Sequence, residues 1–522
     1  MATPGEKLAA SLKELKKLQQ NENVVAIKSS EINRTHRERL TKNGFLKEVS
    51  KGWYIFTNPS DKPGESTSWY TSYWNFCSRY LADKYSGNYC VSAEQSLLLH
   101  VGKTTIPQQL ITKSPKGPNK VIPLLYETVL LELKGKLPPE ENLEIKNNIR
   151  VYNLESSLIN IQPVMFKTNP NDVRAALLMI KDSSQILGPL LDGGHTRPAG
   201  RIAGAFRNMG KDKIADEIIS TMRAVEHDVR EVDPFEEQLK LNLSTLMQSP
   251  HVNRIKLKWE EYKKVVVKHF PDGPDQPIDV IDYLNSVDEI YKTDAYHSLS
   301  IERYKVSEEL IDLVSSGAWN VLENDDHKEL ESAMAAKGYF DASREVKSSI
   351  ETILNGTNSG QVVDKDHSTW YQKLFSPSVA AGLCKPSDLA GYRNRPIFIS
   401  NSRHVPMSKE AVRDAMPALF ELLINENHPG TRVVLGHFFF VFIHPYSDGN
   451  GRMARFLMNT MLASGNYPWT VIPVERRKDY MTALEEASVN DNIEPFTIFI
   501  SELVKSSLKG EPEAKLIESK NN

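Results

Sequence analysis

A polar stretch near the C-terminal end, residues 444–455, constrains this chain more than any other feature. It reads His-Pro-Tyr-Ser-Asp-Gly-Asn-Gly-Arg-Met-Ala-Arg. The apolar run 433–443 precedes it, and apolar residues recur at helical spacing after it, from Phe456 to Leu462. The pattern therefore predicts a polar loop that joins two buried helices and leads into the N-terminus of the second.

This loop carries residue types that bind phosphate. Backbone N–H groups are unpaired at a helix N-terminus, and Gly449 and Gly451 would let an anion approach them closely. Asn450 can donate through its amide. Arg452 and Arg455 are three residues apart, so they share one helix face and could each hold a phosphate oxygen. We therefore expect a phosphate site here.

Two more residues of the loop indicate chemistry rather than binding alone. Asp448 offers the hard oxygen ligand that Mg²⁺ takes beside phosphates. His444 stands at the loop entrance and is a proton acceptor suited to neutral pH. The plain alternative is a capped turn with a surface histidine and solvated arginines. Finding the base, the metal ligand, the glycines and the arginines together in so short a stretch favours a catalytic loop.

The loop resembles the signature of the Fic family, H-P-F-x-D/E-G-N-G-R-x-x-R, and differs only at Tyr446, where the family usually has Phe. The resemblance extends over about residues 294–504. It implies transfer of AMP from ATP, with Mg²⁺, to a Ser, Thr or Tyr hydroxyl of a protein target or of the chain itself. His444 would be the base, Asp448 would hold the metal, and Tyr480 would lie near the adenine.

Two other segments resemble parts of the same family. Residues 392–406 resemble its flap, predicted as a β-hairpin whose edge docks an extended target segment, here through Ile397, Phe398 and Ile399. The helix near 296–304 resembles the inhibitory motif S/T-x-x-x-E-G/N, with Ser298 and Glu302 stacked on one face. The resemblance implies that Glu302 pairs with the second arginine of the signature and blocks the γ-phosphate of ATP. Arg303 departs from the motif, and the alternatives are a plain surface hairpin and an ordinary helix.

Length and composition allow several soluble domains. The chain has 522 residues, 40% of them hydrophobic and 25% charged, with a net charge of −3. No signal segment and no membrane-spanning run is visible. Its three cysteines form neither a metal spacing nor a disulfide framework, which predicts the reducing cytoplasm. The sequence leaves the oligomeric state open, with a homodimer as one option.

Residues 1–60 are predicted to form a winged helix-turn-helix. A leucine-lined helix over 6–20, a short helix near 24–32 and a third over 35–43 precede a hairpin signal around 50–52. Four basic residues of the third helix suit DNA: Arg34, Arg37, Arg39 and Lys42. The alternative is a protein-contact module with a solvated basic face.

The rest of the chain completes an α+β multidomain fold class. Residues 61–235 are predicted as a mixed α/β domain. Together with the winged helix, this domain loosely resembles abortive-infection-type antitoxins, which points to a bacterial chain. The resemblance rests on the Gly-Trp-Tyr-Ile-Phe turn at 52–56 and on Ser-Ala-Glu-Gln-Ser-Leu at 92–97. The glycine-rich segment 193–201 favours close helix packing over phosphate binding. Residues 236–507 read as a predominantly α-helical Fic domain and 508–522 as a disordered tail.

Two functional alternatives stay open from the sequence. The chain could be a DNA-binding regulator whose Fic domain senses nucleotide. It could also be a Fic enzyme that removes AMP or transfers another phosphate-containing group. The match of the signature at every position except Tyr446, with Asp448 present, favours AMP transfer.

Overall fold

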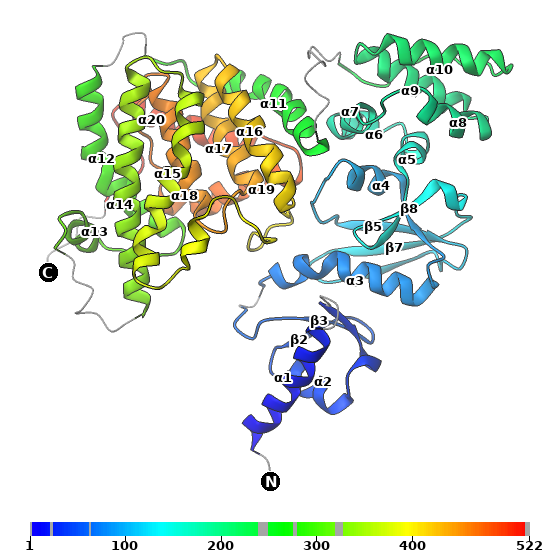
Figure 1. Ribbon diagram of the computed structural model, residues 1–522, viewed down its shortest axis with the longest axis horizontal. Coiled ribbons are helices and arrows are strands. Elements are labelled where there is room, and N and C mark those ends of the chain that lie inside the picture. The colour runs from blue at the N-terminus through cyan, green and yellow to red at the C-terminus, as the bar shows by residue number, and fades with distance from the viewer. Residues whose placement is uncertain are drawn as a thin grey trace. The chain divides into compact units, whose positions relative to one another are not determined.

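A computed structural model describes residues 3–20, 25–61, 64–237, 249–274, 279–318 and 327–516. The chain divides into two compact units, each described by itself below. Unit 1 comprises Met1–Arg254 together with Phe398–Val405, and unit 2 comprises Ile255–Ile397 and Pro406–Asn522. Figure 1 shows strands only in the N-terminal part and a helical array in the remainder, so the fold class is α+β and multidomain.

The N-terminal part of unit 1 is a three-stranded antiparallel sheet with two helices. Its strands run in the order β1-β3-β2. The helices are α1 (Pro4–Gln20) and α2 (Arg34–Lys42), and the strands are β1 (Ala26–Lys28), β2 (Leu46–Ser50) and β3 (Trp53–Phe56). The prediction of a helix near 24–32 is wrong, because β1 pairs with β3 there and only the turn η1 (Ser29–Glu31) is helical. Buried Ala26 and Ile27 explain the strand, since both lie in the core.

The middle of unit 1 is a mixed domain around a four-stranded sheet of order β4-β5-β7-β6. Helix α3 (Thr67–Tyr85) packs on β1 and β3 of the preceding sheet and contributes Trp69, Tyr73 and Phe76 to one shared core. Ser92 caps α4 (Ala93–His100) by accepting from Gln95 N–H. The strands are β4 (Cys90–Val91), β5 (Gln109–Ser114), β6 (Lys120–Pro123), β7 (Val129–Lys134), β8 (Leu143–Lys146) and β9 (Ile149–Tyr152), with η2 (Glu140–Asn142) before β8.

The helices that follow between residues 154 and 224 of unit 1 are α5 (Leu154–Asn160), α6 (Met165–Thr168), α7 (Pro170–Leu178), α8 (Ser184–Asp192), α9 (Thr196–Asn208) and α10 (Asp212–Ala224). The glycines of α9 serve packing. A Cβ atom on Gly200 or Gly204 would clash with the carbonyl oxygens of Arg230 and Val232. This close approach of backbones agrees with the packing interpretation of the segment.

Unit 2 is helical. Its elements are α11 (Pro250–His269, of which the first turn belongs to unit 1), α12 (Val280–Ile301), α13 (Glu308–Ser315), α14 (His327–Leu354), α15 (Ser359–Ala380), η5 (Pro386–Leu389), α16 (Lys409–Asn425), α17 (Pro429–Ile443), α18 (Asn450–Ala463), η6 (Val474–Arg476), α19 (Arg477–Val489) and α20 (Glu494–Leu508). Asp279 caps α12 by accepting from the N–H groups of Ile281 and Asp282. This helix ends at Ile301, directly before Glu302.

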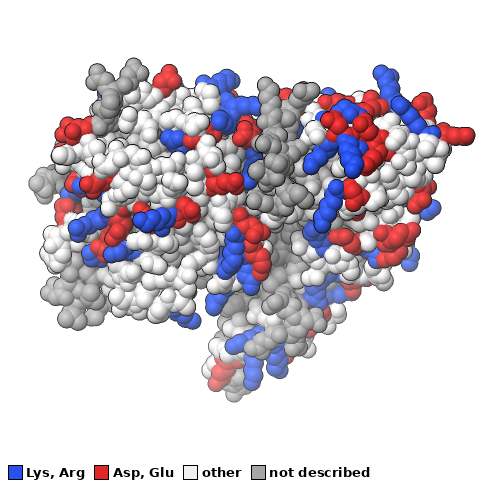
Figure 2. All heavy atoms as spheres, turned by 45° about the horizontal axis from the view of Figure 1, so that its top comes forward, with Lys and Arg blue, Asp and Glu red and all other residues white. Residues whose placement is uncertain are grey.

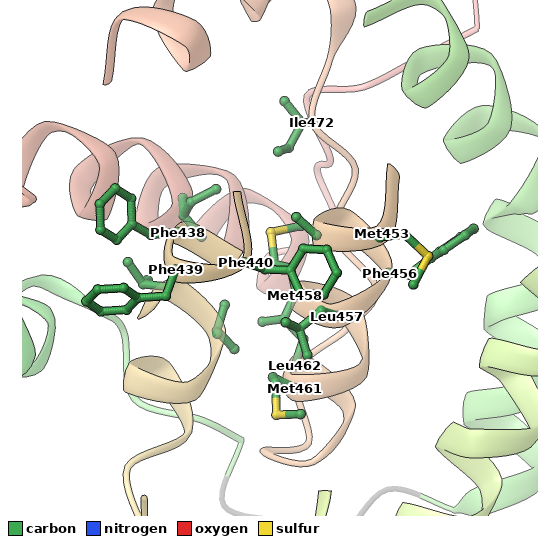
Figure 3. Close-up of a cluster of buried hydrophobic side chains, with 14 of the residues drawn as sticks. Phe438, Phe439, Phe440, Met453, Phe456, Leu457, Met458, Met461, Leu462 and Ile472 are labelled. Atoms are coloured by element: carbon green, nitrogen blue, oxygen red, sulfur yellow. The ribbon is translucent and has the colours of Figure 1, made fainter. Parts of the chain in front are cut away.

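The core of unit 2 positions the polar loop. Helices α17 and α18 pack along each other, and nearly every side chain of both is buried, as the uninterrupted apolar pattern requires. Figure 3 shows part of this cluster, in which Phe438, Phe439 and Phe440 come from α17 and Leu457 and Met458 from α18. The loop between the helices therefore has rigid walls on both sides.

The end of the chain differs from the disordered tail predicted from residue 508. Ala514 is buried in the core of unit 2, and Glu513 forms an ion pair with Arg476 at 3.2 Å. An alanine anchor and an ion pair hold the chain on the helical domain up to residue 516, and the rest of the predicted tail lies outside the described residues.

The surface charge does not favour general binding of polyanions. On the face drawn in Figure 2, Lys and Arg are interspersed with Asp and Glu, in line with a net charge of −3. Among the helices of the described ranges, none combines the length and apolarity needed to cross a bilayer.

Candidate active site

The polar loop lies between α17 and α18, as predicted. His444 closes α17 in a left-handed conformation with φ 55°, and Gly449 precedes α18 with φ 77°. The first position is costly for a residue with a Cβ atom, while the second suits glycine. A Cβ atom on Gly449 would lie 2.7 Å from the Phe375 ring, so glycine is also required by space.

The ring of His444 is oriented by the backbone. Its Nδ1 lies 3.1 Å from the carbonyl oxygen of Val441. Because a carbonyl can only accept, Nδ1 must carry the proton and Nε2 keeps its lone pair. Burial lowers the pKa of His444 to about 4, a hydrogen bond to Val441 opposes this, and the charge of Arg393 adds to it. The side chain, which keeps partial solvent exposure, is thus a neutral imidazole with Nε2 available as a proton acceptor.

Asn450 and Tyr446 shape the loop from inside. The Asn450 amide donates to the Tyr446 carbonyl at 2.8 Å and accepts from the Tyr446 N–H at 2.9 Å. Tyr446 stacks on Tyr371 with ring centroids 3.7 Å apart and is buried. The Asn450 amide thus closes the loop with one of its two N–H groups, and the expected donation from this side chain to a phosphate stays a prediction. Tyr446 packs as an anchor, so its departure from Phe is harmless.

Two buried arginines line the start of α18. Arg452 lies between the rings of Tyr304 and Phe375, at 5.1 Å and 4.9 Å from their centroids, and donates to Asp448 at 3.3 Å. Within the described part of the chain, its Nε and the Nη1 of Arg455 have no hydrogen-bond partner. A buried guanidinium N–H without an acceptor is costly. Such groups suit an anionic ligand that brings oxygens into the site.

Glu302 occupies the space where such an anion would bind. Its Oε1 lies 2.8 Å from Arg455 Nη2, and a Cβ atom on Gly451 would clash with the same oxygen. Arg455 also donates from Nε to the Ser298 hydroxyl at 2.9 Å and from Nη2 to the Ser298 carbonyl at 3.0 Å. Burial alone would raise the pKa of Glu302, but the charges of Arg455 and Arg452 outweigh it and lower the pKa. The carboxylate is therefore ionised and sits at the N-terminus of α18.

The C-terminal end of α12 is held by a residue from a distant segment of the chain. Arg477 donates to the Ile301 carbonyl at 2.7 Å and so caps α12. Arg303 follows with φ 71°, the left-handed region. This conformation gives a physical reason for the Gly or Asn that the resembled motif has at this position, because those residues tolerate it. Arg303 retains the conformation at an energetic cost.

Asp448 stays at the rim of the site. Its side chain is largely exposed, and its Oδ1 accepts from the Gly449 N–H at 2.7 Å. No cluster of three or more acidic, histidine or cysteine ligands occurs among the described residues. A single exposed carboxylate fits Mg²⁺, which usually takes one or two carboxylates and completes its shell with phosphates and water.

Tyr480 lies behind Arg455 rather than at an open surface. It is 1% exposed, and its hydroxyl lies 2.7 Å from Nε2 of buried His437. The contact of Tyr480 with adenine stays a prediction, and the burial of the Tyr480 side chain does not favour it.

The segment predicted as the flap has a turn but no strand pairing. Ser402 N–H donates to the Ile399 carbonyl at 3.2 Å, and the structure assigns no strand between residues 390 and 408. Two prolines in the arms lack the N–H groups that strand pairing requires. Other groups of the segment bind outside it: Arg403 exchanges hydrogen bonds with the backbone of Ile106, and Asn401 N–H donates to Thr67. Phe398 is 38% exposed, while Ile397 and Ile399 are half-buried.

The predicted DNA-binding arginines are largely committed within unit 1. Arg37 donates to the Ser29 carbonyl, and Arg39 to the Lys7 carbonyl and the Ser11 hydroxyl. Arg34 pairs with Glu38 at 2.7 Å on an exposed surface, and Lys42 is exposed. The structure therefore does not gather four free cations on α2.

Comparisons with known proteins agree with the geometry of the loop. The Fic/DOC family model matches residues 365–462. This chain contains a Fic domain. It is 34% identical over 131 residues to a protein adenylyltransferase Fic of Nematostella vectensis. The matched region covers 24% of this chain and 30% of the relative. Protein adenylyltransferase fic-1 of Caenorhabditis elegans is 28% identical over 132 residues, covering 24% of this chain and 25% of the relative.

The chain thus matches less than a third of each relative's length. These relatives are animal proteins, which do not support the expectation of a bacterial chain. Among solved structures, Fic-1 (residues 134–508) from C. elegans has a TM-score of 0.36 at 14% identity, covering 66% of this chain and 87% of that chain. A Fic domain containing signaling protein from Bacteroides thetaiotaomicron has a TM-score of 0.33 at 17% identity, covering 51% and 99%.

Sequence reasoning missed several residues that build the site. Tyr304, Phe375 and Arg477 support the arginines or the end of α12, and Arg393 supports the loop. They come from segments distant in sequence and follow no local spacing, so only a three-dimensional arrangement reveals them.

Proposed function

We propose that the protein transfers AMP from ATP to a hydroxyl of a protein side chain, its own or a target's, and that Glu302 holds it in an inhibited state. The observation that carries the proposal is the Glu302 carboxylate on Arg455, at a helix N-terminus with spare buried donors. An anion already occupies the site, and a nucleotide phosphate is the anion for which the domain's relatives are named.

His444 is the general base in this proposal. Its Nε2 takes the proton of the attacking hydroxyl, whose oxygen forms a bond to the α-phosphorus of ATP. The bond from the α-phosphorus to the bridging oxygen breaks, and pyrophosphate leaves. The hydrogen bond from Nδ1 to the Val441 carbonyl supports this role, because it fixes the tautomer and stabilises the imidazolium that forms.

The start of α18 stabilises the phosphates. The backbone N–H groups at Asn450 and Gly451 offer the positive end of the helix dipole, while the Gly449 N–H donates to Asp448 Oδ1 at 2.7 Å. Arg452 would bind the β-phosphate and Arg455 the γ-phosphate once Glu302 has left. Mg²⁺ held by Asp448 would neutralise charge on the phosphates and the leaving pyrophosphate.

A target would present its hydroxyl beside the flap. Ile397, Phe398 and Ile399 offer apolar side chains with partial exposure for this contact. The cytoplasmic location expected from the cysteines stays a prediction, as does the homodimer.

The test separates AMP transfer from other phosphate chemistry. Protein carrying Glu302→Gly is incubated with Mg²⁺ and with ATP labelled either at the α-phosphate or at the γ-phosphate. The proposal expects the α-label alone to enter protein, with an adduct of the mass of AMP. Entry of the γ-label would indicate phosphoryl transfer, removal of AMP from a modified protein would indicate the reverse reaction, and no incorporation would contradict the proposal.

DNA binding is a second candidate function, on narrower grounds. The strand order β1-β3-β2, with α2 before a two-stranded hairpin, supports a winged helix. The exposed cations left for DNA on α2 are Arg34 and Lys42. Fluorescence anisotropy with a mixed-sequence DNA duplex at low salt tests this candidate. DNA affinity unchanged by Arg34→Ala with Lys42→Ala would contradict it.

A further inference from the structure

One buried guanidinium outside the catalytic loop connects the loop to the base of the flap. Arg393 lies between η5 and the flap turn and is 2% exposed. Its Nε donates to the His444 carbonyl at 2.8 Å, and its backbone N–H donates to the Pro445 carbonyl at 2.9 Å. Its Nη1 donates to the Arg395 carbonyl at 3.2 Å, and its Nη2 donates to the Met407 carbonyl.

These four bonds join three segments of unit 2. Arg395 lies in the first arm of the flap and Met407 directly follows the second arm, so the guanidinium ties the two arms together at their base. The remaining two bonds hold consecutive carbonyls at the start of the catalytic loop. A planar fork with several fixed donors suits such a junction, whereas an ammonium group or an amide cannot make the same set of bonds.

The bond to His444 acts on a strained residue. His444 has φ 55° and ψ 61°, a conformation that disfavours a side chain and persists only where its surroundings enforce it. Its N–H donates to the Phe440 carbonyl at 3.0 Å, which holds the residue from one side. Arg393 donates to the His444 carbonyl on the other side of the residue. The two hydrogen bonds together fix the backbone of the residue that carries the imidazole.

We propose that Arg393 is a positioning residue that keeps His444 in its left-handed conformation and couples that conformation to the two arms of the flap. The inference rests on the proposed function for its effect on transfer. Its charge acts in the same direction, because Arg393 favours the neutral imidazole that a base requires. A flap that moves, for example on target binding, would pull on the same guanidinium that holds His444.

The test uses the full chain with Glu302→Gly, into which Arg393→Gln or Arg393→Lys is added. Arg393→Gln should lower the transfer rate at saturating ATP on the order of 100-fold, as for a catalytic group displaced by about 1 Å. The affinity for ATP, measured by calorimetry, should change less than about threefold, since no phosphate ligand is touched. Arg393→Lys should recover part of the rate, because it keeps the charge and one donor.

The control variant is Arg413→Gln. Arg413 also donates to a backbone carbonyl, that of Lys409, and to the Asn394 side chain, but it is exposed and touches nothing in the loop. It should leave both the rate and ATP affinity unchanged. If Arg393→Gln and Arg413→Gln behave alike, the inference is overturned.

A second readout does not depend on transfer. The His444 imidazole is titrated by NMR with labelled histidine, its signal being assigned by its loss in His444→Ala. Arg393→Gln should raise the pKa of His444 toward its ordinary value, and Arg413→Gln should not. An unchanged titration together with an unchanged rate overturns the inference. If the parent protein transfers no AMP, the proposed function fails, while a shifted His444 titration in Arg393→Gln still supports the coupling. If Arg393→Gln does not fold, Arg393→Lys is used for both the rate and the titration.

Discussion

Arginines of two helices, α2 in unit 1 and α18 in unit 2, have opposite surroundings. On α2, Arg37 and Arg39 donate to backbone carbonyls and a hydroxyl of neighbouring segments, so their hydrogen bonds hold the small domain together. On α18, Arg452 and Arg455 are buried, keep N–H groups without partners in the described structure, and face an ionised carboxylate. The same residue type therefore stabilises the fold in one place and offers a ligand site in the other.

The difference shows that a basic cluster in a sequence is weak evidence of a ligand. A carbonyl acceptor satisfies an arginine permanently, because the folded chain cannot withdraw it. A carboxylate on a separate helix can leave, and an incoming phosphate can replace it. We therefore expect only the second arrangement to act as a switch.

The largest expected effect comes from the base of the catalytic loop. His444→Ala, made in the Glu302→Gly protein, should lower AMP transfer about 10²–10⁴-fold while ATP binding persists. Labelling with α-labelled ATP measures the rate and calorimetry the binding. A rate within a few-fold of the parent would exclude His444 as the base.

The pH dependence of the parent protein should follow the lowered pKa of His444. Because burial lowers that pKa to about 4, the imidazole is neutral, and able to accept a proton, at every pH well above 4. Transfer should therefore hold steady as the pH falls from 8 to 6, and decline only toward 4. A midpoint near the ordinary histidine value, about 6.5, would contradict this environment.

The next effect concerns the carboxylate that distinguishes α18 from α2. Glu302→Gly should raise transfer on the order of 10- to 100-fold, because a hydrogen bond between charged groups contributes about 1.5–3 kcal/mol. Adding Arg455→Ala should abolish the gain, since the freed guanidinium is then missing. Glu302→Gln, which keeps the size and loses the charge, should fall between wild type and Glu302→Gly. A single mutant no faster than wild type would make the pair purely structural.

How much the sequence predicts depends on whether the information is local. The loop 444–455 is predicted well because its chemistry, its glycines and its flanking apolar runs are contiguous. Strand β1 is missed because three residues in a row carry no period, and pairing with β3 decides their conformation. The same limit hides Arg393, whose four acceptors lie two to about fifty residues away.

A smaller effect tests the other side of the comparison. Arg39→Ala should lower the free energy of unfolding of the N-terminal part by about 1–2 kcal/mol, because the Lys7 carbonyl and the Ser11 hydroxyl lose a donor. Arg34→Ala is the matched control on the same helix; its exposed pair with Glu38 should contribute less than about 0.5 kcal/mol. Thermal and urea unfolding measure both. If Arg39→Ala is as stable as Arg34→Ala, the hydrogen bonds of Arg39 are not what holds α1 to α2.

The smallest expected effect refines the switch itself. Arg303 follows Glu302 with φ 71°, where a side chain costs about 1 kcal/mol relative to glycine. Arg303→Gly should therefore favour the docked end of α12, strengthen the contact between Glu302 and Arg455, and lower basal transfer about fivefold. Arg303→Ala removes the same charge but keeps the Cβ atom, so it should not strengthen inhibition. Self-labelling of wild type and the two variants distinguishes backbone strain from charge: if Arg303→Ala lowers labelling as much as Arg303→Gly, the positive charge rather than the left-handed conformation weakens inhibition.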